Sequence, residues 1–170
     1  NTMLFFTEKG KCFWLKVYEI PEGTKQSKGR ALQNLLNIEP DDKVKAYINL
    51  LDLKDYDYIN SNYIVLCTKK GIIKKTTLEA YSRPRQNGVN AITIKEGDQL
   101  LEAVLTSGHS EVIIAAKNGK AIRFNEEVVR PIGRTGAGVK GITIDDDDEV
   151  VGMICVEKDV KEDILVVSEN

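Results

Sequence analysis

The chain has 170 residues, of which 42% are hydrophobic and 29% are charged, a composition that fits one folded domain or a few repeats. No segment approaches the roughly 20 consecutive apolar residues of a membrane helix, and residues 1–6 lack the features of a signal peptide, so we expect no membrane partner. The formal net charge of −2, taken over the whole chain, argues against nucleic acid as a partner.

The first pattern along the chain is a β-hairpin signature that occurs three times. In each copy an apolar strand leads to a tight turn with a glycine, and the strand that follows carries basic residues. The copies span residues 4–16, 65–76 and 113–124, with their turn glycines at Gly10, Gly71 and Gly119. Glycine adopts the positive φ that a short hairpin turn requires, so these segments predict three hairpins.

The three copies remain similar beyond the hairpin. Each continues with a second glycine, a short apolar stretch, an acidic turn and a final strand. The second glycines are Gly29, Gly88 and Gly138, and the final strands cover residues 44–51, 100–106 and 150–156. About four short strands in each repeat of about 50 residues predict an all-β fold of propeller-like blades, each a four-stranded antiparallel sheet.

The repeats define the expected domain organisation. We predict units at about residues 3–62, 63–110 and 111–162, with the start of a fourth at 163–170. Helical patterns are short: residues 31–36 allow one or two turns, and residues 51–62 form a polar, tyrosine-rich loop inserted in the first unit. Because repeats contact mainly their neighbours, a partial array of blades still buries a core.

Charge is unevenly distributed within each repeat. Residues 9–30 hold six basic and two acidic residues, residues 69–95 hold seven and one, and residues 117–140 hold six and two. These segments have net charges of +4, +6 and +4, and the rest of the chain has −16. If the blades stack with like halves together, their basic halves form one continuous edge and the acidic halves another. Such a basic edge is the footprint of a long polyanion, whose phosphates release counterions when Lys and Arg neutralise them.

Several short motifs are specific as a set. The second repeat contains Thr-Lys-Lys-Gly-Ile-Ile-Lys-Lys-Thr-Thr-Leu at 68–78, and the third contains motifs at 119–124, 129–134 and 138–142. The first repeat contains motifs at 16–21, 28–30 and 34–36. Together they resemble blades of the C-terminal DNA-wrapping domain of the DNA gyrase A protein. The resemblance implies a β-pinwheel fragment of about three blades, with strand exchange between neighbours and DNA bent around a basic rim.

The resemblance also implies a function and a setting. The chain would be a DNA-binding and DNA-wrapping module of a type IIA topoisomerase, bending double-stranded DNA to support negative supercoiling. Its partners would be double-stranded DNA, the rest of the gyrase A protein, and the gyrase B protein in an A2B2 assembly, in the bacterial cytoplasm at the nucleoid. The cleavage tyrosine and the ATP site of such an enzyme lie elsewhere, which implies no catalytic site and no cofactor in this chain.

Two alternative functions stay open. The first blade of that family carries the sequence Gln-Arg-Arg-Gly-Gly-Lys-Gly, which the chain lacks, and the nearest run is residues 25–30. Its absence leaves the related C-terminal domain of topoisomerase IV as an alternative. The other alternative is a β-propeller that binds a protein partner through its loops rather than through its rim.

We expect DNA to be contacted by lysines and arginines of the three basic segments. They are Lys11, Lys25, Lys28 and Arg30 in the first, Lys69, Lys70, Lys74, Lys75, Arg83 and Arg85 in the second, and Lys117, Lys120, Arg123, Arg130, Arg134 and Lys140 in the third. Their role would be to neutralise phosphates, which positions a duplex without reading its sequence.

Other motifs predict no catalytic or metal site. Residues 136–141 have the spacing of a dinucleotide fingerprint, but a strand-like segment follows where that motif needs a helix. Residues 145–148 lack the spacing of an EF-hand, which predicts a solvated turn. His109 has no second histidine and no triad partner. The three cysteines have no metal-ligand spacing, and such free thiols indicate a reducing, cytoplasmic compartment.

Overall fold

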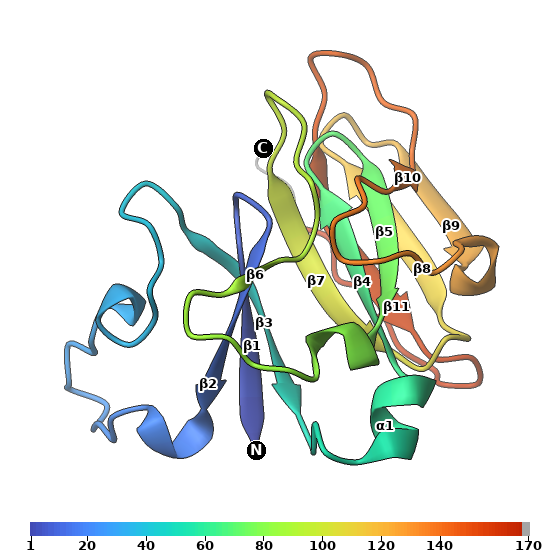
Figure 1. Cartoon of the computed structure of the whole chain (residues 1–170). Helices are drawn as coiled ribbons and strands as arrows, with labels where there is room; N and C mark the ends of the chain where they lie inside the picture. Colours follow the sequence, from blue (N-terminus) through green and yellow to red (C-terminus); the bar gives the residue numbers. More distant parts are fainter. Residues whose placement is uncertain (168–170) are drawn as a thin grey trace.

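A computed structural model describes residues 1–167, and residues 168–170 lie outside the described part. Within it the chain is all-β, as predicted, and its strands form three antiparallel sheets (Figure 1). The first has the order β3 (Val44–Leu50), β1 (Thr2–Thr7), β2 (Lys11–Lys16), β6 (Val89–Asn90). The second has the order β10 (Val139–Lys140), β5 (Ile72–Thr77), β4 (Tyr63–Thr68), β7 (Leu100–Thr106). The third has the order β11 (Val150–Val156), β8 (Glu111–Ala116), β9 (Ala121–Asn125).

The three predicted hairpins are confirmed. They are β1–β2, β4–β5 and β8–β9, each antiparallel and each closed by a short turn. Gly10, Gly71 and Gly119 have φ values of 85°, 86° and 86°, the left-handed region that other residues rarely adopt. In each turn the glycine N–H donates to the carbonyl of the residue three positions earlier. The recurring glycine in the sequence therefore marks a fixed backbone geometry.

Neighbouring repeats exchange short strands. β6 follows the second hairpin in the sequence but pairs with β2 of the first sheet, and β10 pairs in the same way with β5. The approach is close: a Cβ at Gly10 would lie 2.6 Å from the carbonyl oxygen of Ile92, and one at Gly71 would lie 2.9 Å from that of Ile142. The turn glycines thus serve two purposes, since they allow both the turn and the docking of the next repeat.

The acidic turns are structural caps. The last aspartate of each turn accepts a hydrogen bond from a backbone N–H in the hairpin turn of the same repeat: Asp42 from Lys9 at 3.1 Å, Asp98 from Lys70 at 3.0 Å and Asp148 from Asn118 at 3.1 Å. Each also accepts from the N–H of the residue that follows it. The prediction that residues 145–148 form a solvated turn is therefore wrong for Asp148, which is buried because it caps this hairpin.

The hydrophobic core lies between the sheets. One cluster joins the first and second sheets through residues such as Leu4 and Ile64, and a second joins the second and third sheets through Val65 and Ile114. A third covers the other face of the first sheet, where Phe13 packs against the segment before β3. Figure 1 shows the first sheet on the left, followed by the second and then the third toward the right. Each fully buried aliphatic side chain contributes about 1.5–3 kcal/mol, so the interfaces between repeats hold the array together.

Short helices occur within the described residues. They are η1 (Val17–Glu19), η2 (Leu32–Asn34), α1 (Tyr56–Ser61), η3 (Leu78–Tyr81) and η4 (Glu126–Val128). η2 is the short turn expected at 31–36. The expectation of a loop at 51–62 is wrong in part, because Asp55 accepts from Tyr58 N–H at 3.0 Å and caps α1, and Ile59 anchors the helix in the core.

The expected start of a fourth unit falls at the edge of the described residues. Residues 163–167 form no strand and are exposed, and residues 168–170 lie outside the description. The unit boundaries at 3–62, 63–110 and 111–162 stay a prediction.

Candidate nucleic-acid interface

The predicted contact residues fall into three environments. Some lie at the hairpin turns beside the acidic turns, two are buried between sheets, and most of the others lie in loops, apart from Arg123 on β9 and Lys140 in β10. Hairpin turns and acidic turns share one end of the molecule, at the top of Figure 1, whereas the loops that precede β6 and β10 cross its middle.

The hairpin lysines mostly meet acidic partners. The Nζ of Lys11 lies 3.3 Å from Glu39, that of Lys69 lies 4.0 Å from Glu149, and that of Lys120 lies 3.3 Å from Asp145. The Nζ of Lys70 donates to the carbonyl oxygen of Asp146 at 3.3 Å, whereas Lys117 has no carboxylate within 4 Å in residues 1–167. The expectation that basic and acidic halves line separate edges is wrong at this end, because each acidic turn must reach its hairpin to cap it. Exposed pairs of this kind contribute about 0–1 kcal/mol and leave the ammonium groups accessible.

Lys74 and Lys75 are buried, with 1% and 4% of their surfaces exposed. A phosphate contact requires an exposed ammonium group, so the interpretation of these two residues as direct contacts is wrong. The physical reason is their place on β5, an inner strand between β4 and β10 that the third repeat covers. The two lysines of this strand therefore lie in the interface between repeats.

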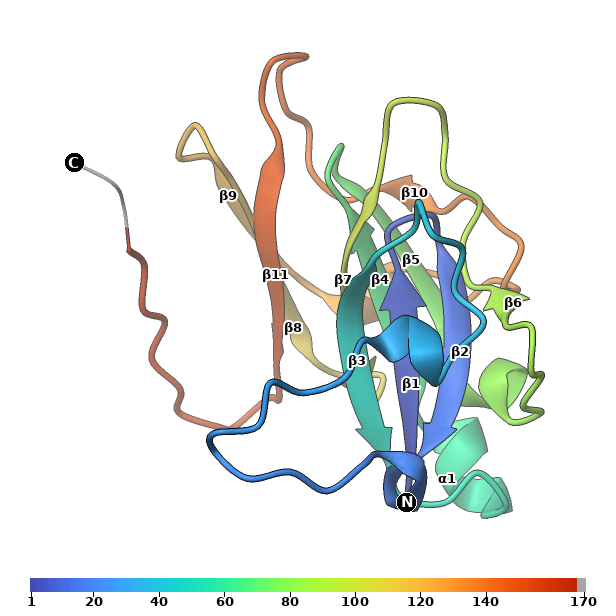
Figure 2. The same cartoon turned by 90° about the vertical axis from the view of Figure 1, so that its left-hand side faces the viewer.

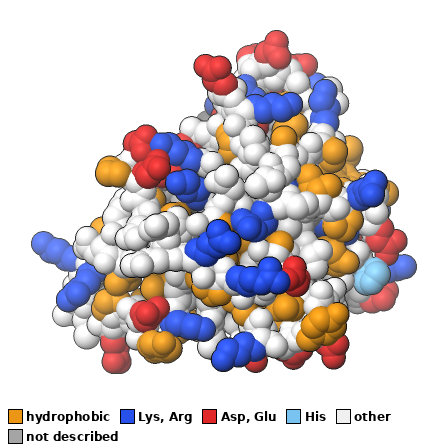
Figure 3. All heavy atoms as spheres, in the orientation of Figure 1, with side chains coloured by type: hydrophobic (Ala, Val, Ile, Leu, Met, Phe, Trp, Pro, Cys, Tyr) orange, Lys and Arg blue, Asp and Glu red, His pale blue; other side chains and the backbone are white. Residues whose placement is uncertain are grey.

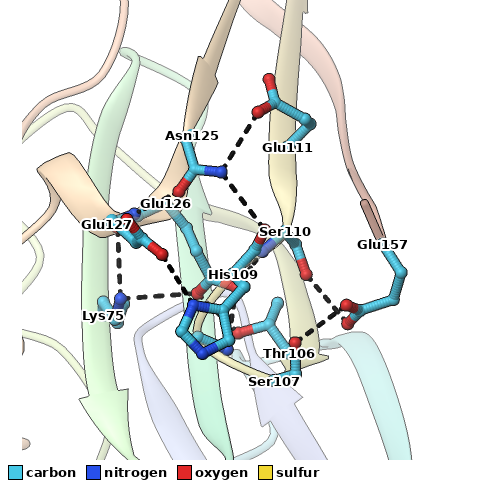
Figure 4. Close-up of polar contacts among 11 residues, drawn as sticks. Lys75, Thr106, Ser107, His109, Ser110, Glu111, Asn125, Glu126, Glu127 and Glu157 are labelled. Atoms are coloured by element: carbon cyan, nitrogen blue, oxygen red, sulfur yellow. Dashed lines mark hydrogen bonds and ion pairs between the residues drawn. The ribbon is translucent and has the colours of Figure 1, made fainter. Parts of the chain in front are cut away.

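Lys75 belongs to a buried polar network (Figure 4). Its Nζ lies 3.6 Å from the carboxylate of Glu126, donates to the Glu126 carbonyl at 3.2 Å, and stands 4.6 Å from the ring centroid of Tyr63. The fully buried Glu126 also accepts from the N–H groups of Gly108 and Ser110 at 3.0 and 2.8 Å. Every group of this pair has a partner, so the network fixes the turn between β7 and β8 against β5.

The surrounding polar residues in Figure 4 do not form a catalytic triad. His109 Nδ1 lies 2.6 Å from Glu127, whose pKa this hydrogen bond lowers. The hydroxyl groups of Ser107 and Ser110 donate to Glu157 instead of to His109, at 2.8 and 3.0 Å. The histidine therefore has an exposed hydrogen-bond partner, and among residues 1–167 no serine or cysteine side chain hydrogen-bonds to it.

Two of the basic loops lie against each other. Arg134, in the loop before β10, donates from Nη1 to the carbonyl oxygen of Asn90 at 3.1 Å, and the N–H of Thr93 donates to Gly136 at 3.2 Å. These contacts place residues 82–90 of the second repeat beside residues 130–140 of the third. In Figure 3 Lys and Arg side chains gather in the middle of the visible face, over β6 and the loop before it.

The cations of this junction are accessible. Arg85, Arg130 and Lys140 are exposed and have no carboxylate within 4 Å among the described residues, whereas Arg134 is half-buried. Arg83 is exposed but lies 3.0 Å from Glu79, and Arg123, on β9, lies 3.7 Å from Glu111. The two loops thus present several positive charges whose fields are not cancelled by a partner.

The first repeat contributes a separate group. Lys25, Lys28 and Arg30 are exposed and unpaired with carboxylates among residues 1–167, in a loop with no regular structure. Figure 2 shows this loop on the opposite side of the first sheet from the loop before β6. The structure brings together the predicted contacts of the second and third repeats, and it does not bring those of the first repeat beside them.

Burial raises the pKa of the Cys12 thiol, and it raises those of Cys67 and Cys155 to about 12, so all three are protonated at neutral pH. No group of three metal-ligating side chains is found in the described part. Over residues 1–167, no helix has both the length and the apolar character needed to cross a bilayer.

The sequence contains a signal that bears on the burial of Lys74. This residue is the third after its turn glycine, and the equivalent positions hold Phe13 and Ile122. These apolar residues predict an interior position, which the structure shows for Phe13, 1% exposed, and not for Ile122, 39% exposed. The contact between the two loops left no such signal, since Asn90 and Arg134 meet only through tertiary structure.

Known proteins similar to the chain share this architecture. A family model described as DNA gyrase C-terminal domain, beta-propeller, matches residues 1–46, 62–107 and 110–157. A DNA gyrase A protein from Staphylococcus aureus (strain NCTC 8325 / PS 47) is 41% identical over 168 residues, which cover 99% of this chain and 18% of that protein. One from Staphylococcus epidermidis (strain ATCC 12228 / FDA PCI 1200) is 40% identical over the same shares. The chain therefore spans less than a fifth of the length of these relatives.

Two solved structures are similar over most of the chain. The crystal structure of the C-terminal domain of DNA topoisomerase IV has a TM-score of 0.80 and 28% identity, and covers 92% of this chain and 47% of that one. The structure of a DNA gyrase A C-terminal domain has a TM-score of 0.73 and 23% identity, and covers 91% and 47%. At that identity the second likeness concerns the fold alone.

Proposed function

The chain belongs to the DNA gyrase C-terminal domain family, and we propose that it is a non-catalytic module that binds double-stranded DNA along its basic loops. The observation that carries this proposal is the junction of the second and third repeats. There, two loops about 50 residues apart in sequence meet through Arg134 and Asn90 and expose arginines and lysines without acidic partners. Accessible, unpaired cations of this kind displace condensed counterions when phosphates bind.

The contact set follows from the side-chain environments. Arg85, Arg130, Arg134 and Lys140 form the central group, and Lys25, Lys28 and Arg30 form a second, separate group on the first repeat. The hairpin lysines Lys11, Lys69 and Lys120 take a secondary place because their acidic partners must first be displaced. Each residue would neutralise a phosphate, so binding tolerates any sequence and depends strongly on salt.

The relatives suggest a larger setting for this module. We propose that it is part of a gyrase A protein, that it acts with the rest of that protein and with the gyrase B protein in an A2B2 assembly in the cytoplasm at the nucleoid, and that it wraps DNA to support negative supercoiling. Bending 20–30 base pairs by 40–90° costs on the order of 1–6 kcal/mol, so the cost must be shared among several contacts. The TM-score of 0.80 to a topoisomerase IV C-terminal domain favours that enzyme as the second candidate.

Fluorescence anisotropy with a labelled duplex at increasing salt tests DNA binding. We expect a steep loss of affinity between about 50 and 200 mM salt, with a logarithmic slope of about −0.9 for each phosphate neutralised. The charge-reversal variant R85E/R130E/K140E should bind at least about tenfold more weakly than wild type.

The matched control is K11E/K69E/K120E, which reverses three cations that face acidic turns. It should lose less affinity than the loop variant at every salt concentration. Affinity that does not change with salt would refute the proposed DNA binding. Retained binding of a protein partner by the loop variant would instead favour the protein-binding propeller.

A further inference from the structure

Lys74 occupies a position where the fold does not need a charge. In the first repeat the same position after the turn glycine is Phe13, which is 1% exposed, as Lys74 is. Both side chains lie beneath the incoming segment of the next repeat: a Cβ at Gly88 would lie 2.7 Å from the Phe13 ring, and one at Gly138 would lie 3.1 Å from Lys74 Cβ. An apolar side chain therefore fulfils the packing role at this site.

The ammonium group of Lys74 joins the two basic loops from below. Its Nζ donates to the carbonyl oxygen of Ala91, directly after β6, and to that of Arg134, in the loop before β10, both at 2.5 Å. Above it, Arg134 donates to Asn90, and Thr93 Oγ1 donates to Thr135 at 2.7 Å. The charge of Lys74 thus contacts the backbone of both segments of the junction.

This charge has no acidic partner. No carboxylate lies within 4 Å of Lys74 Nζ in residues 1–167, in contrast to Lys75, which pairs with Glu126. Burying an unpaired charge is unfavourable, and an apolar replacement of similar size is commonly neutral or stabilising. A lysine that costs stability where Phe13 suffices in the neighbouring repeat indicates a role beyond packing.

We propose that Lys74 is a positioning residue of the polyanion site, which holds the loops of the second and third repeats in one continuous cationic surface, and whose proton is bound more tightly when a polyanion occupies that surface. The inference rests on the proposed DNA-binding function. Lys74 does not touch the ligand; it fixes Arg134 and the segment around Asn90, and it supplies a positive charge just beneath them.

The local electrostatics set the pH range of the effect. Burial, and next the nearby Arg134, lower the pKa of Lys74 from 10.5 to about 8. Tyr81 and Cys12 also lie near Arg134, and burial raises the pKa of both, so they stay neutral at pH 7–9.5. A polyanion on the loops favours the charged form of Lys74 and raises its pKa, so binding takes up a proton above pH 8.

The experiment measures duplex binding by anisotropy from pH 6.5 to 9.5 at constant ionic strength, for wild type, K74M and the control K43M. Lys43 is an exposed lysine beside an acidic turn, away from the junction. For wild type and K43M we expect the affinity for DNA to fall about tenfold between pH 7 and 9.5. This factor follows if DNA binding raises the pKa of Lys74 by about one unit. K74M should bind more weakly at pH 7 and show no fall over this range.

The outcomes separate the two proposals. If no variant binds DNA in a salt-dependent way at any pH, the proposed function fails and the inference falls with it. If wild type binds and K74M has the same affinity and the same pH profile, the inference alone is overturned. Circular dichroism melts at each pH check that each variant is folded under the binding conditions. K74L serves as a second apolar variant. An NMR titration of the Lys74 Nζ should also show a higher pKa when DNA is added, and an unchanged pKa would contradict the proposal.

Discussion

The two junctions between repeats use the same backbone geometry with opposite chemistry. In the first, the indole N–H of Trp14 donates to the carbonyl oxygen of Tyr81 in η3 at 2.8 Å; in the second, Lys75, at the same position after its turn glycine, donates to Glu126 in η4 at 3.2 Å. The 3-10 helix begins with Leu78 at one junction and with Glu126 at the other, both buried. The first junction is apolar and the second is ionic.

The difference shows that charge at the second junction is not needed to join two repeats. An apolar junction avoids the desolvation of charged groups, which a buried ion pair only partly repays. The ionic junction lies where the two basic loops meet, and its buried lysines hold backbone carbonyls rather than reach solvent. We therefore infer that the desolvation cost of this junction is linked to the cationic surface above it.

The largest expected effect tests the ionic junction directly. Glu126→Gln leaves the charge of Lys75 buried without a counter-charge, and we expect a loss of about 3–5 kcal/mol in the free energy of unfolding. Urea unfolding followed by circular dichroism measures it. Glu127→Gln, one residue further and exposed, is the matched control and should change stability by less than about 0.5 kcal/mol. Equal effects of the two variants would show that the buried pair is not a stability determinant.

A second prediction compares Lys74 with its counterpart Phe13 through pH. The pKa of Lys74 in the folded chain, about 8, lies below the ordinary 10.5, so the unfolded chain binds a proton that the folded chain has lost. The contribution of Lys74 to the free energy of unfolding therefore rises between about pH 8 and 10.5, by on the order of 3 kcal/mol.

Urea unfolding at pH 7.5, 9 and 10 checks this rise. Over this interval the free energy of unfolding of wild type should rise by more than that of K74M. Parallel profiles of the two proteins would mean that Lys74 titrates normally. Because the expected stability change is opposite in sign to the expected change in DNA affinity, loss of folding cannot mimic loss of binding.

The smallest expected effect concerns the apolar junction. Trp14→Phe keeps an aromatic ring but removes the N–H that Tyr81 accepts, and we expect a loss of about 1–2 kcal/mol. Thermal unfolding measures it, with Phe5→Leu in the same sheet as a packing control that touches no hydrogen bond of the junction. No loss in Trp14→Phe would indicate that apolar burial alone joins the first two sheets.

Much of the fold was predictable because it depends on local signals. The turn glycines predicted the hairpins, and the period of the repeats predicted an all-β array of blades. The short exchanged strands could not be predicted from the sequence. Two residues such as Val89 and Asn90 show no periodicity and pair only with a distant strand. The cap of α1 at Asp55 was visible, but the tyrosines and polar residues around it indicated a loop.

The site was predictable only in part, for a physical reason. Composition identified the basic segments, in whose loops Arg83, Arg85 and Arg130 are exposed and Arg134 is half-buried. Burial of β5 on both faces removed the alternation that would have separated inner from outer positions, so Lys74 and Lys75 resembled surface cations. Nor did charge counts reveal that the acidic turns bend back to cap the hairpins through Asp42, Asp98 and Asp148. Which of the exposed cations contact DNA stays a prediction.

The exchange of β6 and β10 has a consequence for engineering. A cut between one sheet and the next, for example near residue 62, would separate β2 from the strand that completes its sheet and leave the donated strand without an edge to join. Grafting or deleting a repeat would succeed only if the boundaries were moved beyond the borrowed strand, so that every transplanted module carried its neighbour's missing piece. The repeat visible in the sequence is therefore not the unit that can be transplanted.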